Sequence, residues 1–157
     1  MSQNPYSNNV LLNLGIQSLN KMQEVAQQAI LNEDNILLLS PTGSGKTLAF
    51  LLPIFQLLEE DVKGVQCLIL VPSRELGLQI EQVWKKMGTH YKVNTCYGGH
   101  SIDIEINNLS NPPALLIGTQ GRIADHLDRG SFATDNIKTY VLDEFDKSLQ
   151  LGYHEEM

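Results

Sequence analysis

Short runs of branched apolar residues recur along the chain and alternate with longer amphipathic segments. The runs lack strict alternation of apolar and polar residues, which favours strands that are buried on both faces of a sheet. Strands that alternate with helices are typical of an α/β fold in three layers, with a parallel sheet between two layers of helices. The predicted strands are Ile36–Leu39, Cys67–Val71, Val93–Tyr97, Leu115–Ile117 and Tyr140–Leu142.

The segments between these runs have the length and apolar spacing of helices. Pro53 is expected to bend the second of them. The first 13 residues are rich in Asn, Ser and Gln and are expected to be poorly ordered, so the folded part is expected to cover residues 14–157. The predicted helices are Lys21–Leu31, Lys46–Glu59, Arg74–Met87, Ile102–Asn108, Arg122–Leu127 and a last one that starts at Phe145.

Composition narrows the class of protein. With 157 residues and 42% apolar content, the chain is long enough for one domain with a real core. Its net charge of −7 argues against binding nucleic acid through diffuse positive charge, so any such contact must be local. The longest apolar stretch, Leu48 to Leu58, is interrupted and too short to span a bilayer, and the start lacks the features of a secretory signal. We therefore expect a cytoplasmic protein.

The cysteines and histidines do not predict a metal site. Cys67 and Cys96 fall within predicted strands, which favours buried, reduced thiols. The four histidines are scattered without the spacing of metal ligands, so we expect each to be exposed or paired within the fold. They are His90, His100, His126 and His154.

A glycine-containing loop follows the first predicted strand and opens a helix. Glycines 43 and 45 allow a close backbone curl that turns successive N–H groups towards phosphates. Lys46 can then reach the outer phosphates and Thr47 can bind Mg²⁺. An ordinary helix start is the alternative. The predicted nucleotide-binding residues of the loop are Thr42, Gly43, Ser44, Gly45, Lys46 and Thr47, and Ser40 stands where the pattern usually begins with glycine.

An acidic turn follows the last predicted strand. Asp143 comes directly after Tyr140–Leu142 and can hold the magnesium ion, in part through water. Glu144 can orient an attacking water. A solvated acidic turn is the alternative. Together with the loop, these residues predict a site for a nucleoside triphosphate and magnesium, with Lys46, Asp143 and Glu144 as catalytic residues.

Further motifs follow the other predicted strands in a fixed order. They are Pro72-Ser73-Arg74-Glu75-Leu76, Gly98-Gly99, Thr119-Gln120-Gly121-Arg122 and Asp143-Glu144-Phe145-Asp146. With the phosphate loop, this series resembles the first RecA-like domain of a DEAD-box RNA helicase, from about Leu14 to the last residue. The resemblance implies a RecA-like domain that uses ATP and Mg²⁺ and binds RNA.

The resemblance also assigns an adenine-binding residue. Leu14-Gly15-Ile16 and Lys21-Met22-Gln23 are similar to the family's glutamine motif, and Gln23 would then bind adenine. A carboxamide offers a donor and an acceptor side by side, which matches the N6 and N7 edge of adenine. A merely solvated glutamine is the alternative. The family's stacking aromatic residue would lie before Met1, so we expect weaker adenine affinity than in a complete relative.

Six residues match positions that line the RNA-binding face of the family. Arginine forms forked contacts with phosphate, and glycines and helix starts offer bare N–H groups, so the RNA backbone is held without sequence readout. Alternatively, Gly98-Gly99 is a plain turn and Arg122 pairs with Asp125. Gln120 replaces a usual proline and is expected to loosen its turn. The six residues are Arg74, Gly98, Gly99, Thr119, Gly121 and Arg122.

The resembled family continues past the acidic motif into a Ser-Ala-Thr strand and a second RecA-like domain, whose arginines complete the ATP site. We expect this chain alone to bind nucleotide with little turnover and no unwinding. The absent strand would lie between Ile36–Leu39 and Tyr140–Leu142, so we expect an exposed gap there, and Asp146, whose family role is to contact that segment, would be idle. Phe145 replaces the usual alanine with an effect that the sequence leaves open.

Two other functions fit the motifs less well. One is a non-catalytic, nucleotide-responsive RNA-binding or scaffolding module, and the other is a DNA helicase of the same superfamily. Gln23 and the motifs at Pro72 and Thr119 match the RNA group better. The sequence predicts no membrane association and leaves the oligomeric state open.

Overall fold

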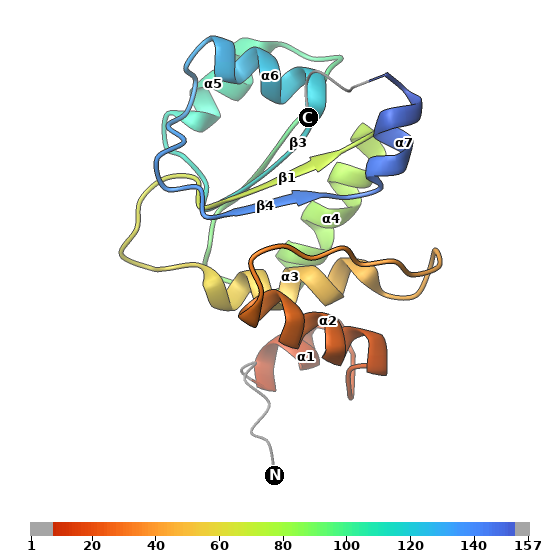
Figure 1. Ribbon diagram of the computed structural model, residues 1–157. Coiled ribbons are helices and arrows are strands. Elements are labelled where there is room, and N and C mark those ends of the chain that lie inside the picture. The colour runs from red at the N-terminus through yellow and green to blue at the C-terminus, as the bar shows by residue number, and fades with distance from the viewer. Residues whose placement is uncertain (1–7, 153–157) are drawn as a thin grey trace. The chain divides into compact units, whose positions relative to one another are not determined.

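The computed structural model describes residues 8–152 of the chain (Figure 1). His154 and residues 1–7 of the expected loose start lie outside these residues. The chain forms two compact units. The first comprises residues up to Glu59 together with Val83–Thr89, and the second comprises Glu60–Gln82 and the residues from His90 onward. No helix within the described range is both long and apolar enough to cross a membrane.

The first unit is helical. It contains α1 (Asn8–Leu14), α2 (Lys21–Asn32), α3 (Lys46–Leu57) and the last turn of α4 (Arg74–Met87). Residues 8–13 differ from the loose segment expected from their polar composition. They belong to α1 because Val10 and Leu11 are buried and the Asn13 amide donates to the Met87 carbonyl over 3.1 Å. Pro53 lies inside α3 and is buried there.

The prediction of a strand at Ile36–Leu39 is wrong. These residues form neither strand nor helix, and Leu37 and Leu39 are 67% and 78% exposed. A strand needs a neighbour for its backbone groups and a surface on which to bury its side chains. Among the described residues Ile36–Leu39 pairs with no strand, so its apolar composition alone does not make it one.

The second unit is built on a parallel sheet of four strands in the order β2-β3-β1-β4. The strands are β1 (Cys67–Val71), β2 (Val93–Cys96), β3 (Leu115–Thr119) and β4 (Thr139–Leu142). Val71 is in register with Thr119, Leu70 with Leu142, and Cys96 with Gly118. The carboxyl ends of all four strands therefore meet at one edge of the sheet, which is where ligands bind in folds of this kind.

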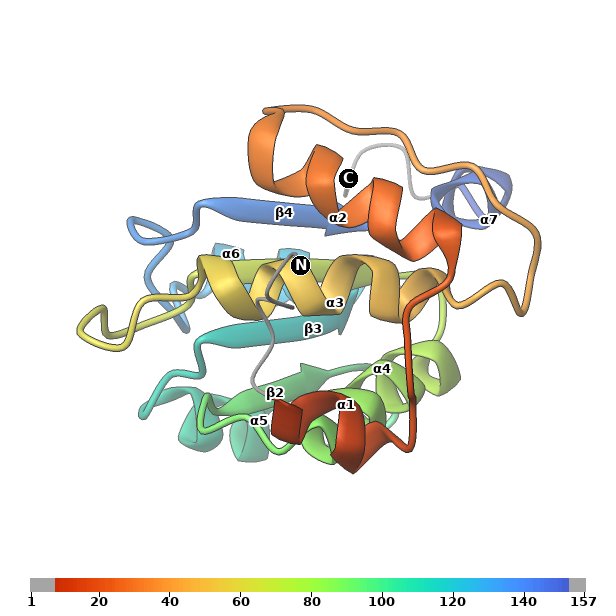
Figure 2. The same cartoon turned by 90° about the horizontal axis from the view of Figure 1, so that it is seen from below.

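Helices α5 (Ile102–Leu109) and α6 (Gln120–Asp128) cover one face of this sheet, as Figures 1 and 2 show. Alternate residues of a strand point to opposite faces. Leu68 and Leu70 of β1 belong to a buried cluster with Leu116 of β3, Leu109 of α5 and Ile123 of α6. This cluster is the apolar core between the sheet and the two helices.

The second unit's part of α4 covers the opposite face of the sheet (Figure 1). The contact is close at Gly77, where a Cβ atom would lie 3.1 Å from Thr95 Cγ2 and 3.3 Å from Val71 Cγ2. A larger residue would push the helix away from β1 and β2. The predicted α/β architecture, a parallel sheet between helical layers, is thus confirmed.

Strand β4 departs from the prediction that every strand is buried on both faces. It is the last strand of the order, beside β1, and its Tyr140 and Leu142 side chains are 47% and 36% exposed. Apolar side chains are therefore accessible on the strand that leads into the acidic turn. The short helix α7 (Phe145–Gln150) follows that turn.

Candidate nucleotide- and RNA-binding sites

The phosphate-loop residues form a compact turn at the start of α3. Gly43 and Gly45 adopt φ values of 80° and 90°, which side-chain-bearing residues rarely adopt. The Lys46 ammonium donates to the carbonyl oxygens of Ser40 and Pro41 over 2.5 and 3.1 Å. The loop is thus held closed by the same lysine that is predicted to bind phosphates.

Ser40, which stands where glycine was expected, has a place in this turn. Its hydroxyl lies 2.5 Å from the Ser44 hydroxyl, and this hydrogen bond joins the start of the loop to its middle. The departure from the pattern therefore adds a contact within the loop.

The glutamine motif lies against the phosphate loop within the first unit. Gln23 Nε2 donates to the Gly45 carbonyl over 3.2 Å, and Asn20 Nδ2 donates to the Ser44 carbonyl over 3.1 Å. Asn20 and Gln23 also form a capping box at the start of α2, in which Gln23 Oε1 accepts from the Asn20 N–H over 3.0 Å. A Cβ atom on Gly45 would lie only 2.5 Å from Gln23 Nε2.

Gln23 is therefore not the merely solvated glutamine of the alternative interpretation, since it is 6% exposed. A carboxamide has two acceptor lone pairs and two N–H donors. The capping box occupies one lone pair and Gly45 occupies one N–H. One donor and one acceptor remain, which is the pair that the predicted contact with adenine requires.

The acidic turn contains the one residue other than glycine with positive φ among the described residues. Glu144 adopts φ 50° and ψ 44°, between β4 and α7. Its carboxylate accepts from Lys147 Nζ over 2.6 Å, and this hydrogen bond, together with the negative charge, raises the pKa of Lys147. The Asp143 N–H donates to the Leu70 carbonyl over 3.0 Å and so continues the pairing of β4 with β1. Asp146 is exposed, and Phe145 is half-buried.

A cleft of about 620 Å³ opens in the second unit at the carboxyl ends of its strands. It is lined by residues that follow β1, β2 and β3, and five of the six predicted RNA-binding residues are among them: Arg74, Gly98, Thr119, Gly121 and Arg122. Gly99 belongs to the same turn as Gly98 but is not among the lining residues. The Arg74 guanidinium lies 4.7 Å from the centre of the Tyr97 ring, which holds it beside the cleft by a cation–π contact.

Gln120 was expected to loosen its turn, but its side chain is buried and hydrogen-bonded to α7. It is 1% exposed, it starts α6, and its Nε2 atom lies 2.5 Å from the hydroxyl of Ser148 in α7. Its Oε1 atom has no hydrogen-bond partner among residues 8–152. The side chain therefore links the predicted RNA-binding segment to the helix that follows Asp143 and Glu144.

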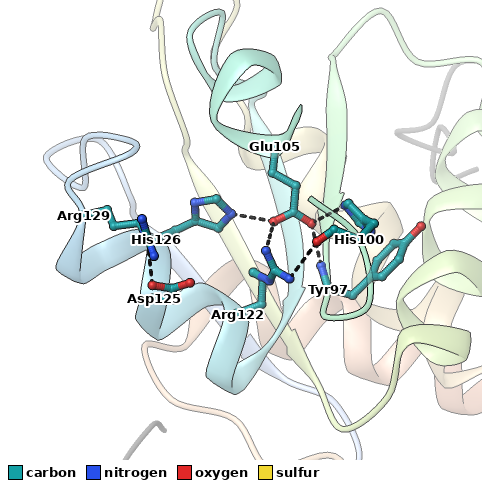
Figure 3. Close-up of polar contacts among 7 residues, drawn as sticks. All are labelled: Tyr97, His100, Glu105, Arg122, Asp125, His126 and Arg129. Carbon is teal, nitrogen blue, oxygen red and sulfur yellow. Dashed lines mark hydrogen bonds and ion pairs between the residues drawn. The ribbon is translucent and has the colours of Figure 1, made fainter. Parts of the chain in front are cut away.

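Arg122 does not pair with Asp125, as the alternative interpretation supposed. Its Nη1 atom lies 3.5 Å from Glu105 Oε2, and its Nη2 atom donates to the His100 carbonyl over 3.2 Å (Figure 3). Asp125 pairs instead with Arg129 over 2.7 Å. Arg122 is thus held at the cleft wall by an internal acid, with 13% of its side chain exposed.

Residues 20–157 match the family model described as "DEAD/DEAH box helicase". This match spans most of the chain. The chain belongs to the DEAD/DEAH box helicase family.

Named relatives agree with this assignment. The chain is 35% identical to "ATP-dependent RNA helicase DeaD" of Escherichia coli over 150 residues, which are 94% of this chain and 24% of that protein. It is 35% identical over 145 residues to "ATP-dependent RNA helicase CshA" of Limosilactobacillus reuteri, covering 91% of this chain and 29% of the relative. The chain thus spans about a quarter of the length of these curated relatives.

Solved structures of DEAD-box proteins share the fold. A DEAD box protein from Methanococcus jannaschii superposes with a TM-score of 0.90 at 33% identity, over 99% of this chain and 43% of that one. A hypothetical ATP-dependent RNA helicase from Sulfolobus tokodaii gives a TM-score of 0.85 at 26% identity, over 98% of this chain and 45% of that one. The predicted RecA-like fold of a DEAD-box domain is therefore confirmed.

In this DEAD/DEAH box helicase chain, Glu105 belongs to none of the motifs, although it contacts residues that line the cleft. Glu105 is 3% exposed, although glutamate is rarely buried. A signal was present in the sequence, because Glu105 stands on the helical stripe that also contains Ile102, Ile106 and Leu109, a position expected to be apolar. His126 gave the same signal, three residues after the buried Ile123, and it is 0% exposed.

Proposed function

We propose that the chain is the ATP- and RNA-binding part of an ATP-dependent RNA helicase that hydrolyses ATP to remodel or locally unwind RNA duplexes. Membership of the DEAD/DEAH box helicase family and the names of its relatives support this proposal. The observation that carries it is the cleft in the second unit. Five residues that the motifs assign to RNA come from three separate segments and line the same cleft.

The first unit would bind the nucleotide. Gly43 and Gly45 have the positive φ angles that let a loop present its backbone N–H groups to phosphate. Lys46 would exchange the carbonyls of Ser40 and Pro41 for phosphate oxygens, which bind an ammonium group more strongly because they are charged. The remaining donor and acceptor of Gln23 would bind adenine.

The Thr47 hydroxyl and the Asp143 carboxylate would hold Mg²⁺, in part through water. Both are oxygen ligands of the kind that this ion prefers, which is the chemical basis for assigning them. Bound magnesium would neutralise developing charge on the phosphates. Glu144 would orient the attacking water. In the structure its carboxylate is paired with Lys147 Nζ at 2.6 Å, and the water would take the place of this contact.

The cleft would hold the RNA backbone without reading its sequence. The Arg74 guanidinium offers a fork of donors to phosphate, and α6 begins at Gln120 with no capping bond from the Thr119 side chain. The N–H groups in the first turn of such a helix favour an anion. Contacts of this type are local, which reconciles RNA binding with a net charge of −7.

We also propose that catalysis needs a second RecA-like domain, and that this chain alone binds nucleotide with little turnover, because arginines supplied from a partner element give about 10³ to 10⁵ in rate in related phosphoryl-transfer enzymes. Within this proposal, residues 14–157 are part of the first RecA-like domain. Location in the cytoplasm stays a prediction.

The test is steady-state ATP hydrolysis by the full-length protein, with and without RNA. We expect RNA to stimulate turnover, and we expect Lys46→Ala and Glu144→Gln each to abolish it. Turnover that RNA does not stimulate would contradict the proposal, and the absence of turnover in the full-length protein would favour the non-catalytic binding module. Stronger stimulation by DNA than by RNA would point to a DNA helicase instead.

A further inference from the structure

One buried carboxylate joins the two sides of the candidate RNA cleft. Glu105 lies in α5, and its Oε1 atom accepts from the Tyr97 N–H and lies within ion-pair distance of His100 Nε2, both at 2.9 Å. Its Oε2 atom lies 2.6 Å from His126 Nε2 and 3.5 Å from Arg122 Nη1. Figure 3 shows these four groups converging on the same side chain.

The partners of Glu105 come from two different segments that line the cleft. Tyr97 and His100 flank the Gly98–Gly99 turn, which follows β2. Arg122 and His126 belong to α6, which follows β3. The second nitrogen of the Arg122 fork donates to the His100 carbonyl over 3.2 Å and so closes a ring of contacts between the segments. The Gly98–Gly99 turn and the start of α6 are thus tied to one another through a single acid.

Because this acid is buried, it restrains the relative position of the two segments that it joins. A carboxylate that is 3% exposed must be paired and hydrogen-bonded, because removing it from water is costly. Two charged or charge-assisted contacts on one oxygen and two contacts on the other fix both its position and its rotation. Neither segment can move away from the other without leaving a buried polar group unpaired.

A metal site is the competing explanation for this cluster. Ligand atoms of Cys96, Glu105 and His126 lie within 4.8 Å of one another, and all three residues are buried. The Arg122 guanidinium, however, already supplies positive charge to the same carboxylate oxygen that faces His126. Burial first, and then the charge of Glu105, raises the pKa of the Cys96 thiol to about 12, so the thiol is protonated when no cation is bound. These observations favour an arginine-neutralised acid over a metal ligand.

We propose that Glu105 is a positioning residue for RNA binding, which holds the Gly98–Gly99 turn and the start of α6 at one fixed spacing. The inference rests on the proposed function, because it takes the cleft as the RNA-binding surface. A preformed spacing lets both segments contact successive phosphates without first being ordered, and such ordering costs affinity. Glu105 itself is buried, so it acts through Arg122, His100 and the Tyr97 backbone.

The experiment compares Glu105→Gln with Glu81→Gln in the full-length protein. Glutamine keeps the size of the side chain and can accept from the Tyr97 N–H, but it removes the charge that faces Arg122. Glu81 is the control, since it joins α4 to β2 by accepting from Thr95 Oγ1 over 3.1 Å, and neither Glu81 nor Thr95 lines the cleft. Glu105→Asp restores the charge on a shorter side chain.

We expect Glu105→Gln to raise the RNA concentration for half-maximal stimulation of ATP hydrolysis about tenfold, a change typical of coupled neighbouring groups. The melting temperature should fall, because Arg122 and His126 lose a buried charged partner. At a temperature at which both variants are folded, ATP affinity should change no more than in Glu81→Gln, and Glu105→Asp should recover part of the RNA affinity. A merely structural role would instead lower ATP affinity and RNA affinity together at that temperature, and that result would overturn the proposal.

Two further outcomes are distinct. Unchanged half-saturation by RNA in Glu105→Gln, while the parent protein responds to RNA, would overturn the role of Glu105 alone. No response of the parent protein to RNA would overturn the proposed function itself. Binding of an unstructured, fluorescent single-stranded RNA without nucleotide should be insensitive to EDTA, and a loss of affinity on chelation would replace this proposal with a metal site.

Discussion

The phosphate loop and the RNA-facing cleft are built in different ways. In the loop, Lys46 and its carbonyl partners Ser40 and Pro41 lie within seven consecutive residues, with Gln23 added from the preceding helix. In the cleft, the lining comes from three segments that follow separate strands, and an acid of α5, Glu105, joins two of them. A contiguous motif carries its own geometry, whereas an assembled surface depends on residues that no motif contains.

If the loop is self-contained, removing its lysine should affect nucleotide chemistry alone. We expect Lys46→Ala in the full-length protein to lower RNA-stimulated turnover by at least about 100-fold, because a charged donor to the phosphates is lost. RNA binding without nucleotide should not change. The control is Lys86→Ala, at an exposed position of α4. A loss of RNA affinity in Lys46→Ala as large as its loss of turnover would contradict the contrast between the two regions.

The link between the loop and the glutamine motif can be tested at Gly45. An alanine there would have φ near 90° and a Cβ atom 2.5 Å from Gln23 Nε2, so we expect Gly45→Ala to lower the free energy of unfolding by about 2 kcal/mol. Adenine nucleotide affinity should fall as well. Gly121→Ala is the matched control, with negative φ and no neighbouring atom within 4 Å of the added Cβ. Denaturant unfolding and nucleotide titration measure both effects, and equal destabilisation in the two variants would refute this account.

The assembled region should instead show coupling between distant residues. Gln120→Ala leaves the buried Ser148 hydroxyl unpaired, and Ser148→Ala leaves Gln120 with no partner at either end. We expect the double variant to be more stable than the sum of the two single changes predicts, by about 1 kcal/mol. A double-mutant cycle from chemical denaturation measures this. Additive effects would show that the hydrogen bond does not contribute.

The smallest expected effect concerns pH. Burial raises the pKa of the Cys96 thiol from 9.0 to about 12, so the folded state favours the protonated thiol. This contribution is complete below pH 9 and is lost as the pH rises towards 12, at no more than about 1.4 kcal/mol per pH unit. We expect Cys96→Ala to reduce the fall in unfolding free energy between pH 8 and pH 10. The same fall in both proteins would contradict the assignment.

The sequence predicted the elements whose pattern and neighbours agree. Arg74–Met87 and Cys67–Val71 occur with the predicted bounds, because an amphipathic stripe and a buried apolar run are both strong local signals. Ile36–Leu39 failed because a strand needs a pairing partner, which composition does not reveal. Helix α6 starts two residues before the prediction, at Gln120, whose side chain is bonded to α7, a contact that no local pattern encodes.

The residues of the candidate sites also fall into two groups, those that a local motif contains and those whose contacts depend on how the elements pack. Motifs predicted Lys46, Gly45 and Gln23 as nucleotide-binding residues, and the structure places Gln23 of α2 against the loop that contains Gly45 and Lys46. Glu105 was missed, although its place on an apolar helical stripe marks it. The partner of Arg122 could not be predicted either, since the choice between Asp125 and Glu105 depends on how α5 packs against α6.

The left-handed conformation of Glu144 has a mechanical consequence for the acidic turn. For a residue with a side chain, the left-handed conformation at φ 50° costs about 1 to 2 kcal/mol, so the backbone of this turn is strained. The ion pair between Glu144 and Lys147, in the first turn of α7, helps to stabilise this strained conformation. Whatever draws Lys147 away from the carboxylate also weakens the restraint on the backbone, and the aim of the Glu144 side chain then changes together with its charge environment.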